Sequence, residues 1–124
     1  MHKILIIEDE ADIVKVLRKR LLDAGFEVFV AYDGYSGTKM AVENKPDLVI
    51  LDLMLPGGHG LLVLKNLHLS MQTSDVPVIV TTGSKDEAYR QKIFDEGVQG
   101  FFEKPFDSEK LIATIKDVLA KLGK

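Results

Sequence analysis

The sequence predicts an α/β domain in which helices cover both faces of a parallel β-sheet. Short apolar runs alternate five times with segments whose apolar residues recur at helical spacing. Three of the runs are continuously apolar, as in strands buried on both faces, and they begin at Ile4, Leu48 and Val78. We therefore expect these three strands at the centre of the sheet. The more mixed runs near Val28 and Phe101 are expected at its edges.

Each expected strand is followed by a helical segment. The strands should cover residues 4–7, 27–30, 48–51, 77–80 and 101–102. Gly25 and Gly97 stand where the first and fourth helices should stop, and Asp86 with Glu87 gives the fourth an acidic first turn. The third and last helices are marked by apolar residues at helical spacing: Leu61, Leu64, Leu67 and Met71, and then Leu111, Ile112, Ile115, Val118, Leu119 and Leu122.

Length and composition limit the class of protein. A chain of 124 residues with 46% apolar and 28% charged residues is expected to be one globular domain, covering residues 1–124. The net charge of −3 disfavours a nucleic-acid binder, which needs clustered Lys and Arg. The chain has no Cys, which fits a reducing cytoplasm, and no apolar run approaches the ~18 residues of a membrane span. We expect a cytoplasmic protein that does not enter a membrane.

Polar and charged side chains stand at the ends of four expected strands. Glu8 and Asp9 follow the first, and Asp52, Thr82 and Lys104 follow the third, fourth and fifth. Each of them alone has an ordinary explanation, such as a helix cap, a turn or a solvated side chain. Parallel strands, however, bring their carboxyl ends to one edge of the sheet, and ligands bind beyond that edge in open α/β sheets. Their common position indicates a binding site.

The side chains at these strand ends suit phosphoryl chemistry. Clustered carboxylates repel one another unless a cation lies between them or a proton is shared. Oxygen ligands without His or Cys favour a hard ion such as Mg²⁺. An Asp beside Mg²⁺ can attack phosphorus to give an acyl phosphate, while the metal and an ammonium group neutralise charge on the phosphoryl oxygens.

The motifs occur in an order and at spacings typical of one family. They are Glu8-Asp9, the run from Asp52 to Gly60, Thr82-Gly83 and Lys104-Pro105-Phe106. Thr82 lies 30 residues after Asp52, and Lys104 lies 22 residues after Thr82. Over essentially its whole length the chain resembles a bacterial response-regulator receiver domain. The resemblance implies a flavodoxin-like (βα)5 doubly wound parallel sheet with strand order 2-1-3-4-5.

The resemblance also implies a phosphorylation site. Asp52 would accept a phosphoryl group from the phosphohistidine of a sensor histidine kinase or phosphotransfer protein. The family pattern places Mg²⁺ on Asp9, Asp52 and the backbone carbonyl of Met54, with Glu8 acting through water. Lys104 would bind the phosphoryl group and precede a cis peptide bond to Pro105, and Thr82 and Phe101 would form the conformational switch.

Four positions depart from the family pattern. Phe101 stands where many receivers have Tyr, and its ordinary interpretation is an edge-strand aromatic that packs on the last helix. His59 occupies a loop position that is often acidic, and we interpret it as solvated. Gly100 and Thr114 stand where DNA-binding winged-helix regulators carry an Asp and an Arg used for dimerisation. We therefore expect a monomer or a weak phosphorylation-dependent dimer.

The function implied is a signalling switch that controls a downstream protein partner or output domain. It would catalyse its own phosphorylation and dephosphorylation without being a conventional turnover enzyme, and would not bind nucleic acid directly. One alternative is a flavodoxin-like mononucleotide-binding domain, but such a site wants a Gly-, Ser- and Thr-rich loop where this chain has Glu8, Asp9 and Glu10. Another is a degenerate receiver that serves only as a scaffold, against which the intact set of Asp9, Asp52, Thr82 and Lys104 argues.

Overall fold

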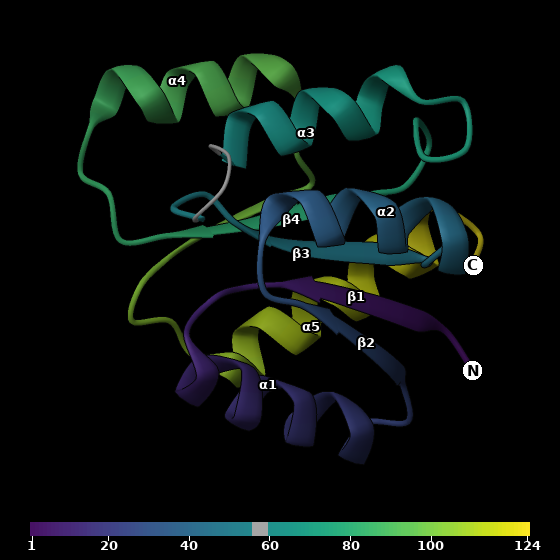
Figure 1. Ribbon diagram of the computed structural model, residues 1–124. Coiled ribbons are helices and arrows are strands. Elements are labelled where there is room, and N and C mark those ends of the chain that lie inside the picture. Colours follow the sequence, from purple (N-terminus) through teal and green to yellow (C-terminus); the bar gives the residue numbers. More distant parts are fainter. Residues whose placement is uncertain (56–59) are drawn as a thin grey trace.

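Helices pack on both faces of a parallel β-sheet in the computed structural model, which describes residues 1–55 and 60–124 (Figure 1). The sheet has the strand order β2-β1-β3-β4-β5. Along the described residues the elements are β1 Lys3–Ile7, α1 Ala11–Asp23, β2 Glu27–Ala31, α2 Gly34–Asn44, β3 Leu48–Asp52, α3 Gly60–Leu69, β4 Val78–Thr82, α4 Glu87–Glu96, β5 Gly100–Glu103 and α5 Ser108–Lys121. The predicted α/β class and strand order are confirmed.

Burial separates the central strands from the edges as the sequence predicts. Every residue of β3 and β4 is buried, and so are four of the five in β1. By contrast β2 has one buried residue, and all four residues of β5 are partly exposed. The continuous apolar runs thus lie where both faces of the strand meet helices.

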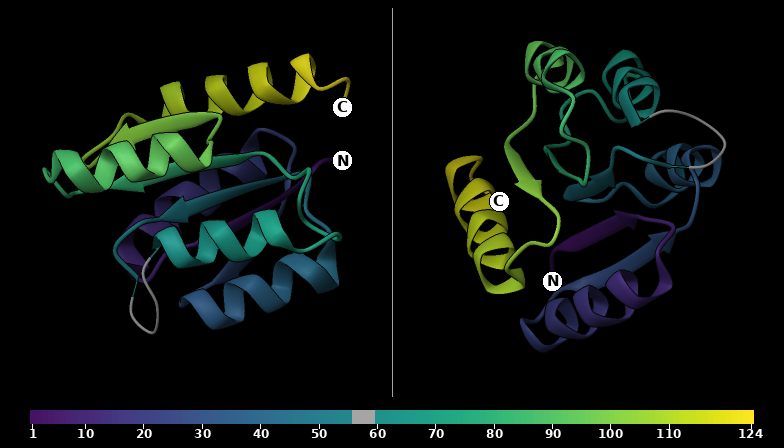
Figure 2. Two further views of the ribbon diagram at one scale, coloured as in Figure 1. Left: turned by 90° about the horizontal axis from the view of Figure 1, so that it is seen from above. Right: turned by 90° about the vertical axis from the view of Figure 1, so that its left-hand side faces the viewer.

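The alternating direction of strand side chains creates two apolar cores. Ile4 and Ile6 point to the face covered by α1 and α5, whereas Leu5 and Ile7 point to the face covered by α2, α3 and α4. The right-hand view of Figure 2 shows these two groups of helices on opposite sides of the sheet. Each helix contributes an apolar stripe to its core, such as Leu111, Ile115 and Val118 of α5.

Aspartates cap three of the helices. The side chain of Asp33 accepts a hydrogen bond from the Ser36 N–H at the start of α2. Asp86 and Asp107 do the same for N–H groups in the first turns of α4 and α5. These bonds satisfy donors that a helix N-terminus leaves without a partner, so they fix where α2, α4 and α5 begin.

Two apolar positions assigned to helices from their spacing lie outside the cores. Helix α3 ends at Leu69, and Met71 follows it in a turn with 94% of its surface exposed. The turn places the hydroxyl of Thr73 2.6 Å from the carbonyl oxygen of Leu67, to which it donates at the end of the helix. Leu122 likewise follows the last residue of α5 and is 51% exposed. The prediction was wrong at both positions because spacing alone does not show where a helix stops.

Both chain ends contact Asp47, which precedes β3. The backbone N–H of Lys3 donates to an Asp47 carboxylate oxygen at 2.8 Å, and the ammonium group of Lys124 lies 3.7 Å from the other oxygen. The two ends are therefore neighbours, as Figure 1 shows. None of the helices in the described residues combines the length and apolarity needed to cross a bilayer.

Candidate functional site

The polar residues predicted to share one edge of the sheet lie at the carboxyl ends of the strands. Glu8 and Asp9 follow β1, Asp52 and Thr82 end β3 and β4, and Lys104 follows β5. In the register of the sheet Asp52 stands beside Thr81, so β3 and β4 end almost level. Because all the strands are parallel, these residues converge although as many as 96 positions separate them in sequence.

Three carboxylates form the acidic part of the site. Glu8, Asp9 and Asp52 each offer an oxygen atom, and these atoms lie within 4.8 Å of one another. Asp52 is 1% exposed and Glu8 3%, whereas Asp9 is exposed to solvent. Two buried carboxylates with a third at the surface give a cluster that a cation would reach from the solvent side.

Lys104 supplies the positive charge of the site. Its ammonium nitrogen lies 2.8 Å from a Glu8 oxygen, 3.4 Å from an Asp52 oxygen and 3.4 Å from a Glu10 oxygen. Only 13% of its side chain is exposed. The peptide bond between Lys104 and Pro105 is cis, as the family resemblance implies. The ion pairs with Glu8 and Glu10 were not predicted, because sequence spacing does not show which acid a lysine faces.

Burial and charge set the ionisation of this cluster. Burial raises the pKa of Glu8 from 4.5 to about 7, although the Lys104 hydrogen bond and the Glu10 N–H oppose it. The nearby charge of Asp52 raises the pKa of Glu8 further. For Lys104, burial lowers the pKa, but the hydrogen bond that its ammonium donates to Glu8 and the charges of Asp52, Glu8 and Glu10 outweigh burial and raise the pKa. The lysine therefore stays protonated beside a glutamate that titrates near neutrality.

Backbone groups orient the Asp52 carboxylate. The N–H of Met54 donates to Asp52 Oδ1 at 3.1 Å, and the N–H of Leu53 donates to the Thr81 carbonyl at 3.0 Å. Met54 itself is 59% exposed. Its carbonyl remains a predicted metal ligand. Residues 56–59, which include His59, predicted to be solvated, lie outside the described residues.

The predicted switch residues occupy neighbouring strands. Thr82 is completely buried, and its hydroxyl oxygen accepts the Ser84 N–H at 3.0 Å. Phe101 packs against α4, where its ring stacks on Phe94 with 5.0 Å between centroids. The interpretation of Phe101 as packing on the last helix was wrong. Phe102 lies on that face of the sheet instead, because adjacent strand residues point to opposite sides.

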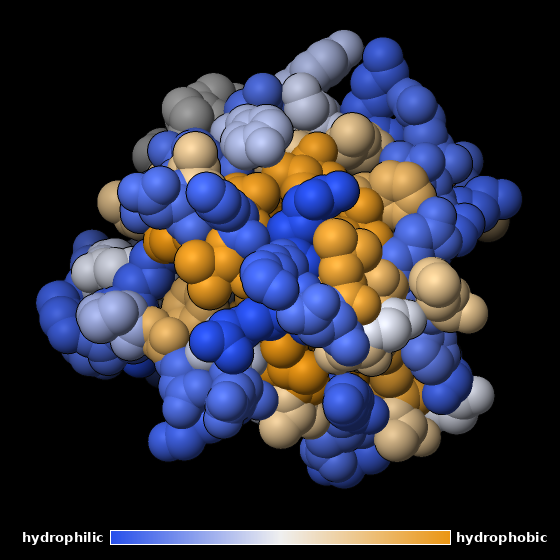
Figure 3. Space-filling model, turned by 90° about the horizontal axis from the view of Figure 1, so that it is seen from below, coloured by the Kyte–Doolittle hydropathy of each residue, from blue (hydrophilic) through white to orange (hydrophobic). Residues whose placement is uncertain are grey.

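An apolar groove of about 270 Å³ adjoins Lys104 on the α1 side. It is lined chiefly by Ile13, Val16 and Leu17 of α1 and by Pro105 and Phe106 of the segment after β5. Figure 3 shows apolar side chains between hydrophilic ones on the face of the molecule that carries α1 and α5. The site thus lies beside a surface that a second macromolecule could contact.

Comparisons with known proteins agree with this arrangement. A family profile for the response regulator receiver domain matches residues 4–116. The chain is 36% identical over 121 residues to the DNA-binding dual master transcriptional regulator RpaA of Synechocystis, an alignment that covers 98% of this chain and 50% of RpaA. It is also 36% identical over 122 residues to the phosphate regulon transcriptional regulatory protein PhoB of Escherichia coli, covering 98% of this chain and 53% of PhoB.

A solved structure shows the same fold. The chemotaxis response regulator CheY4 of Vibrio cholerae superposes with a TM-score of 0.87 and 29% identity, over 95% of this chain and 98% of CheY4. The chain belongs to the response regulator receiver domain family, the signalling domain of two-component systems. This result favours the receiver over the mononucleotide-binding alternative and confirms the flavodoxin-like fold. The chain spans about half the length of the curated relatives it matches.

Proposed function

We propose that residues 1–124 form one receiver domain in which Asp52 accepts a phosphoryl group. The position of Asp52 carries this proposal. It is the last residue of the central strand β3, is 1% exposed, and lies 3.4 Å from the Lys104 ammonium and within the cluster of carboxylates. Glu8 pairs more closely with Lys104, and Asp9 is exposed, so Asp52 is the acid best placed between a cation and an ammonium group.

The acidic cluster fits Mg²⁺. Its donors are oxygen atoms from three acids, the ligand type that a hard divalent cation prefers. Asp9, Asp52 and the Met54 carbonyl would hold the ion, and Glu8 would act through water. When bound, Mg²⁺ would neutralise negative charge on the transferring phosphoryl group.

The chain's own residues then perform the transfer. A carboxylate oxygen of Asp52 attacks the phosphorus of a phosphohistidine, the P–N bond breaks, and the electron pair returns to the donor imidazole. Lys104 exchanges part of its contact with Glu8 for a phosphoryl oxygen, which needs little movement because its ammonium already lies 3.4 Å from Asp52. Attack of water on the acyl phosphate later releases phosphate and restores the carboxylate.

Phosphorylation would change the surface around α4, β5 and α5. The Thr82 hydroxyl would turn to a phosphoryl oxygen, and Phe101 would move into the space that Thr82 leaves. The donor would be a sensor histidine kinase or phosphotransfer protein, for which the groove beside Lys104 is available. The changed face would recruit a downstream protein partner or output domain, with the chain a monomer or weak dimer. Cytoplasmic location and the absence of direct nucleic-acid binding stay predictions.

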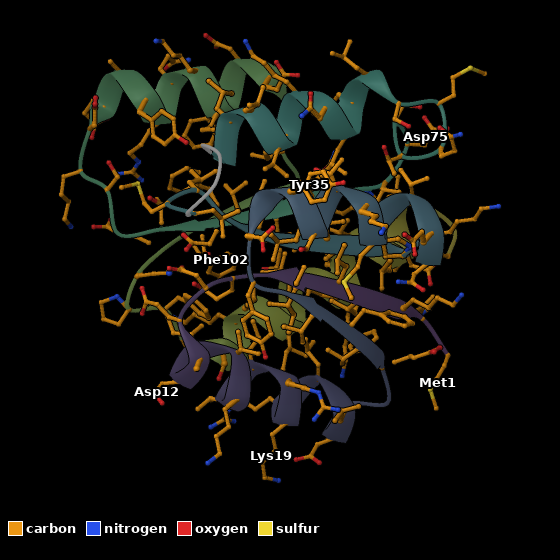
Figure 4. The ribbon with its side chains drawn as sticks, in the orientation of Figure 1. Met1, Asp12, Lys19, Tyr35, Asp75 and Phe102 are labelled. Carbon is orange, nitrogen blue, oxygen red and sulfur yellow. The ribbon has the colours of Figure 1, made fainter. Side chains whose placement is uncertain are left out.

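Chemical phosphorylation tests the proposal. Acetyl phosphate with Mg²⁺ should add one phosphoryl group, measured by intact mass, and Asp52→Asn should abolish this addition. Asp75→Asn is the matched control, because Asp75 is an exposed acid in the turn before β4, at the opposite end of the molecule (Figure 4). Unchanged incorporation in Asp52→Asn would overturn the assignment.

A further inference from the structure

The hydroxyl of Tyr89 joins α4 to the backbone on both sides of the segment between β3 and α3. It donates a hydrogen bond to the Leu53 carbonyl oxygen at 3.1 Å and accepts one from the Leu61 N–H at 3.2 Å. Leu53 directly follows Asp52, and Leu61 belongs to the first turn of α3. A single side chain of α4 thus holds the residue next to the proposed phosphoacceptor.

The Leu53 backbone has little freedom at this point. Its carbonyl oxygen also accepts the Gly60 N–H at 3.1 Å. A Cβ atom on Gly60 would lie only 2.4 Å from the Leu53 Cα, so Gly60 and Leu53 pack backbone against backbone. The next residue, Met54, donates its N–H to the Asp52 carboxylate. A shift of the Leu53 carbonyl would therefore pass to the group that orients Asp52.

Packing alone does not account for the hydroxyl. The Tyr89 ring lies against the core formed with α2 and α3, and a Phe ring would fill the same space. The Leu61 N–H is one of the N-terminal donors of α3 that no helix carbonyl can accept, and Tyr89 provides its acceptor. The Tyr89 hydroxyl therefore donates a hydrogen bond to Leu53, before the segment that joins β3 to α3, and accepts one from Leu61, after it.

We infer that Tyr89 is a positioning residue for phosphoryl transfer, whose hydroxyl fixes the Leu53 carbonyl and so the Asp52–Met54 backbone that carries the carboxylate and the expected Met54 metal ligand. This inference rests on the proposed function of Asp52. It also makes α4 a contributor to the phosphoacceptor site, because any movement of α4 that withdraws Tyr89 removes both hydrogen bonds.

The Tyr89→Phe variant tests this role, since it keeps the ring and deletes the hydroxyl. At saturating acetyl phosphate and Mg²⁺, the maximal phosphorylation rate should fall about 5- to 10-fold, because the variant loses both hydrogen bonds of the hydroxyl. Mg²⁺ affinity, measured by calorimetry without any phosphodonor, should weaken in the same direction. Tyr35→Phe is the matched control, because Tyr35 is 78% exposed on α2 and should change neither quantity (Figure 4).

The two measurements separate this inference from the proposed function. If the unmutated protein binds Mg²⁺ but takes no phosphoryl group, the proposed function fails, and Mg²⁺ affinity alone decides the role of Tyr89. If Tyr89→Phe melts at a lower temperature but keeps wild-type Mg²⁺ affinity and maximal rate, Tyr89 is only structural and the inference is overturned.

Hydrogen exchange in the unmutated protein gives a result that needs no variant. Mg²⁺ should slow exchange of the Leu61 amide together with amides of α4. Protection confined to residues 52–54 would contradict a link through Tyr89.

Discussion

The guanidinium carbon of Arg90 lies 4.6 Å from the centroid of the Phe101 ring. Phe94 stacks on the same ring, so Phe101 is held by two side chains of α4. Arg90 also reaches Glu103, the last residue of β5, at 4.0 Å. These contacts stabilise the arrangement in which Phe101 lies under α4, and a conformation with Phe101 turned toward Thr82 must give them up.

Removing the Arg90 cation should favour that second conformation. A cation–π contact at a partly exposed site contributes about 0.5–1 kcal/mol, so Arg90→Gln should speed phosphorylation by acetyl phosphate about 2- to 5-fold. The proposed switch links Phe101 movement to the phosphorylated state, which explains the direction. Arg18→Gln, on the exposed surface of α1, is the control. Equal rates for Arg90→Gln and the unmutated protein would show that this contact does not restrain Phe101.

The raised pKa of Glu8 predicts how stability depends on pH. Because the pKa of Glu8 is about 7 in the folded protein and 4.5 ordinarily, the folded state binds its proton more tightly than the unfolded state. The stabilisation from this proton is complete below pH 4.5 and is lost as pH rises through about 7. Urea unfolding of metal-free protein should show this fall, and Glu8→Gln should flatten it. If the stability of Glu8→Gln still falls with pH in the same way, another group causes the pH dependence.

Mg²⁺ affinity should change with pH in the opposite direction. The metal favours carboxylates without protons, so binding should strengthen as pH rises through about 7, the pKa of Glu8. Calorimetry in buffers of different ionisation enthalpy should detect the released proton. If Glu8→Gln releases as many protons on binding Mg²⁺ as the unmutated protein, the released proton does not come from Glu8.

Lys104→Ala should affect stability and phosphorylation together. The variant leaves the Glu8 and Asp52 carboxylates without their ammonium partner, which should cost about 1–3 kcal/mol of unfolding free energy at pH 8. The cost should be smaller at pH 5, where Glu8 is protonated, and Mg²⁺ should restore part of the stability. Phosphoryl transfer should fall at every pH. If Lys104→Ala keeps the stability and the phosphorylation rate of the unmutated protein, Lys104 has neither role.

Glycine 60 gives a test of the packing beneath the site. Gly60→Ala places a methyl group 2.4 Å from the Leu53 Cα, so backbone must move, at a cost of about 1–3 kcal/mol in unfolding free energy. Gly83→Ala is the matched control, because a Cβ there meets no atom within 4 Å. Chemical denaturation of the two variants compares them directly. Similar losses in both would indicate a general effect of replacing glycine.

The sequence predicted the architecture well because the strands differ in their patterns. The continuous apolar run at Leu48 could be buried only if helices cover both faces of the sheet, and the mixed run at Val28 suited a strand at the edge of the sheet. The edge of the sheet that carries Asp52 followed from the parallel topology, since the carboxyl ends of all the strands lie at that edge. These inferences use the order of residues and need no distances.

Contacts between distant side chains could not be predicted in the same way. Tyr89 lies 36 residues from Leu53 and 28 from Leu61, and its place on α4 indicates only a helix residue that packs in the core. The pairing of Lys104 with Glu8 in preference to Asp52 depends on side-chain rotamers at three strand ends. The side of β5 that Phe101 occupies depends on register, because a shift of one residue exchanges it with Phe102.

The contacts of Asp47 with Lys3 and Lys124 have a practical consequence for labelling. Asp47 precedes β3, so both chain ends lie at the amino edge of the sheet, a full strand length from Asp52. Fluorescent proteins fused to the two ends would sit side by side without covering the carboxyl edge. For the same reason, a short peptide could connect the ends, and new ends opened in an exposed turn such as the one at Met71 would give a circular permutant with the strand ends of the site undisturbed.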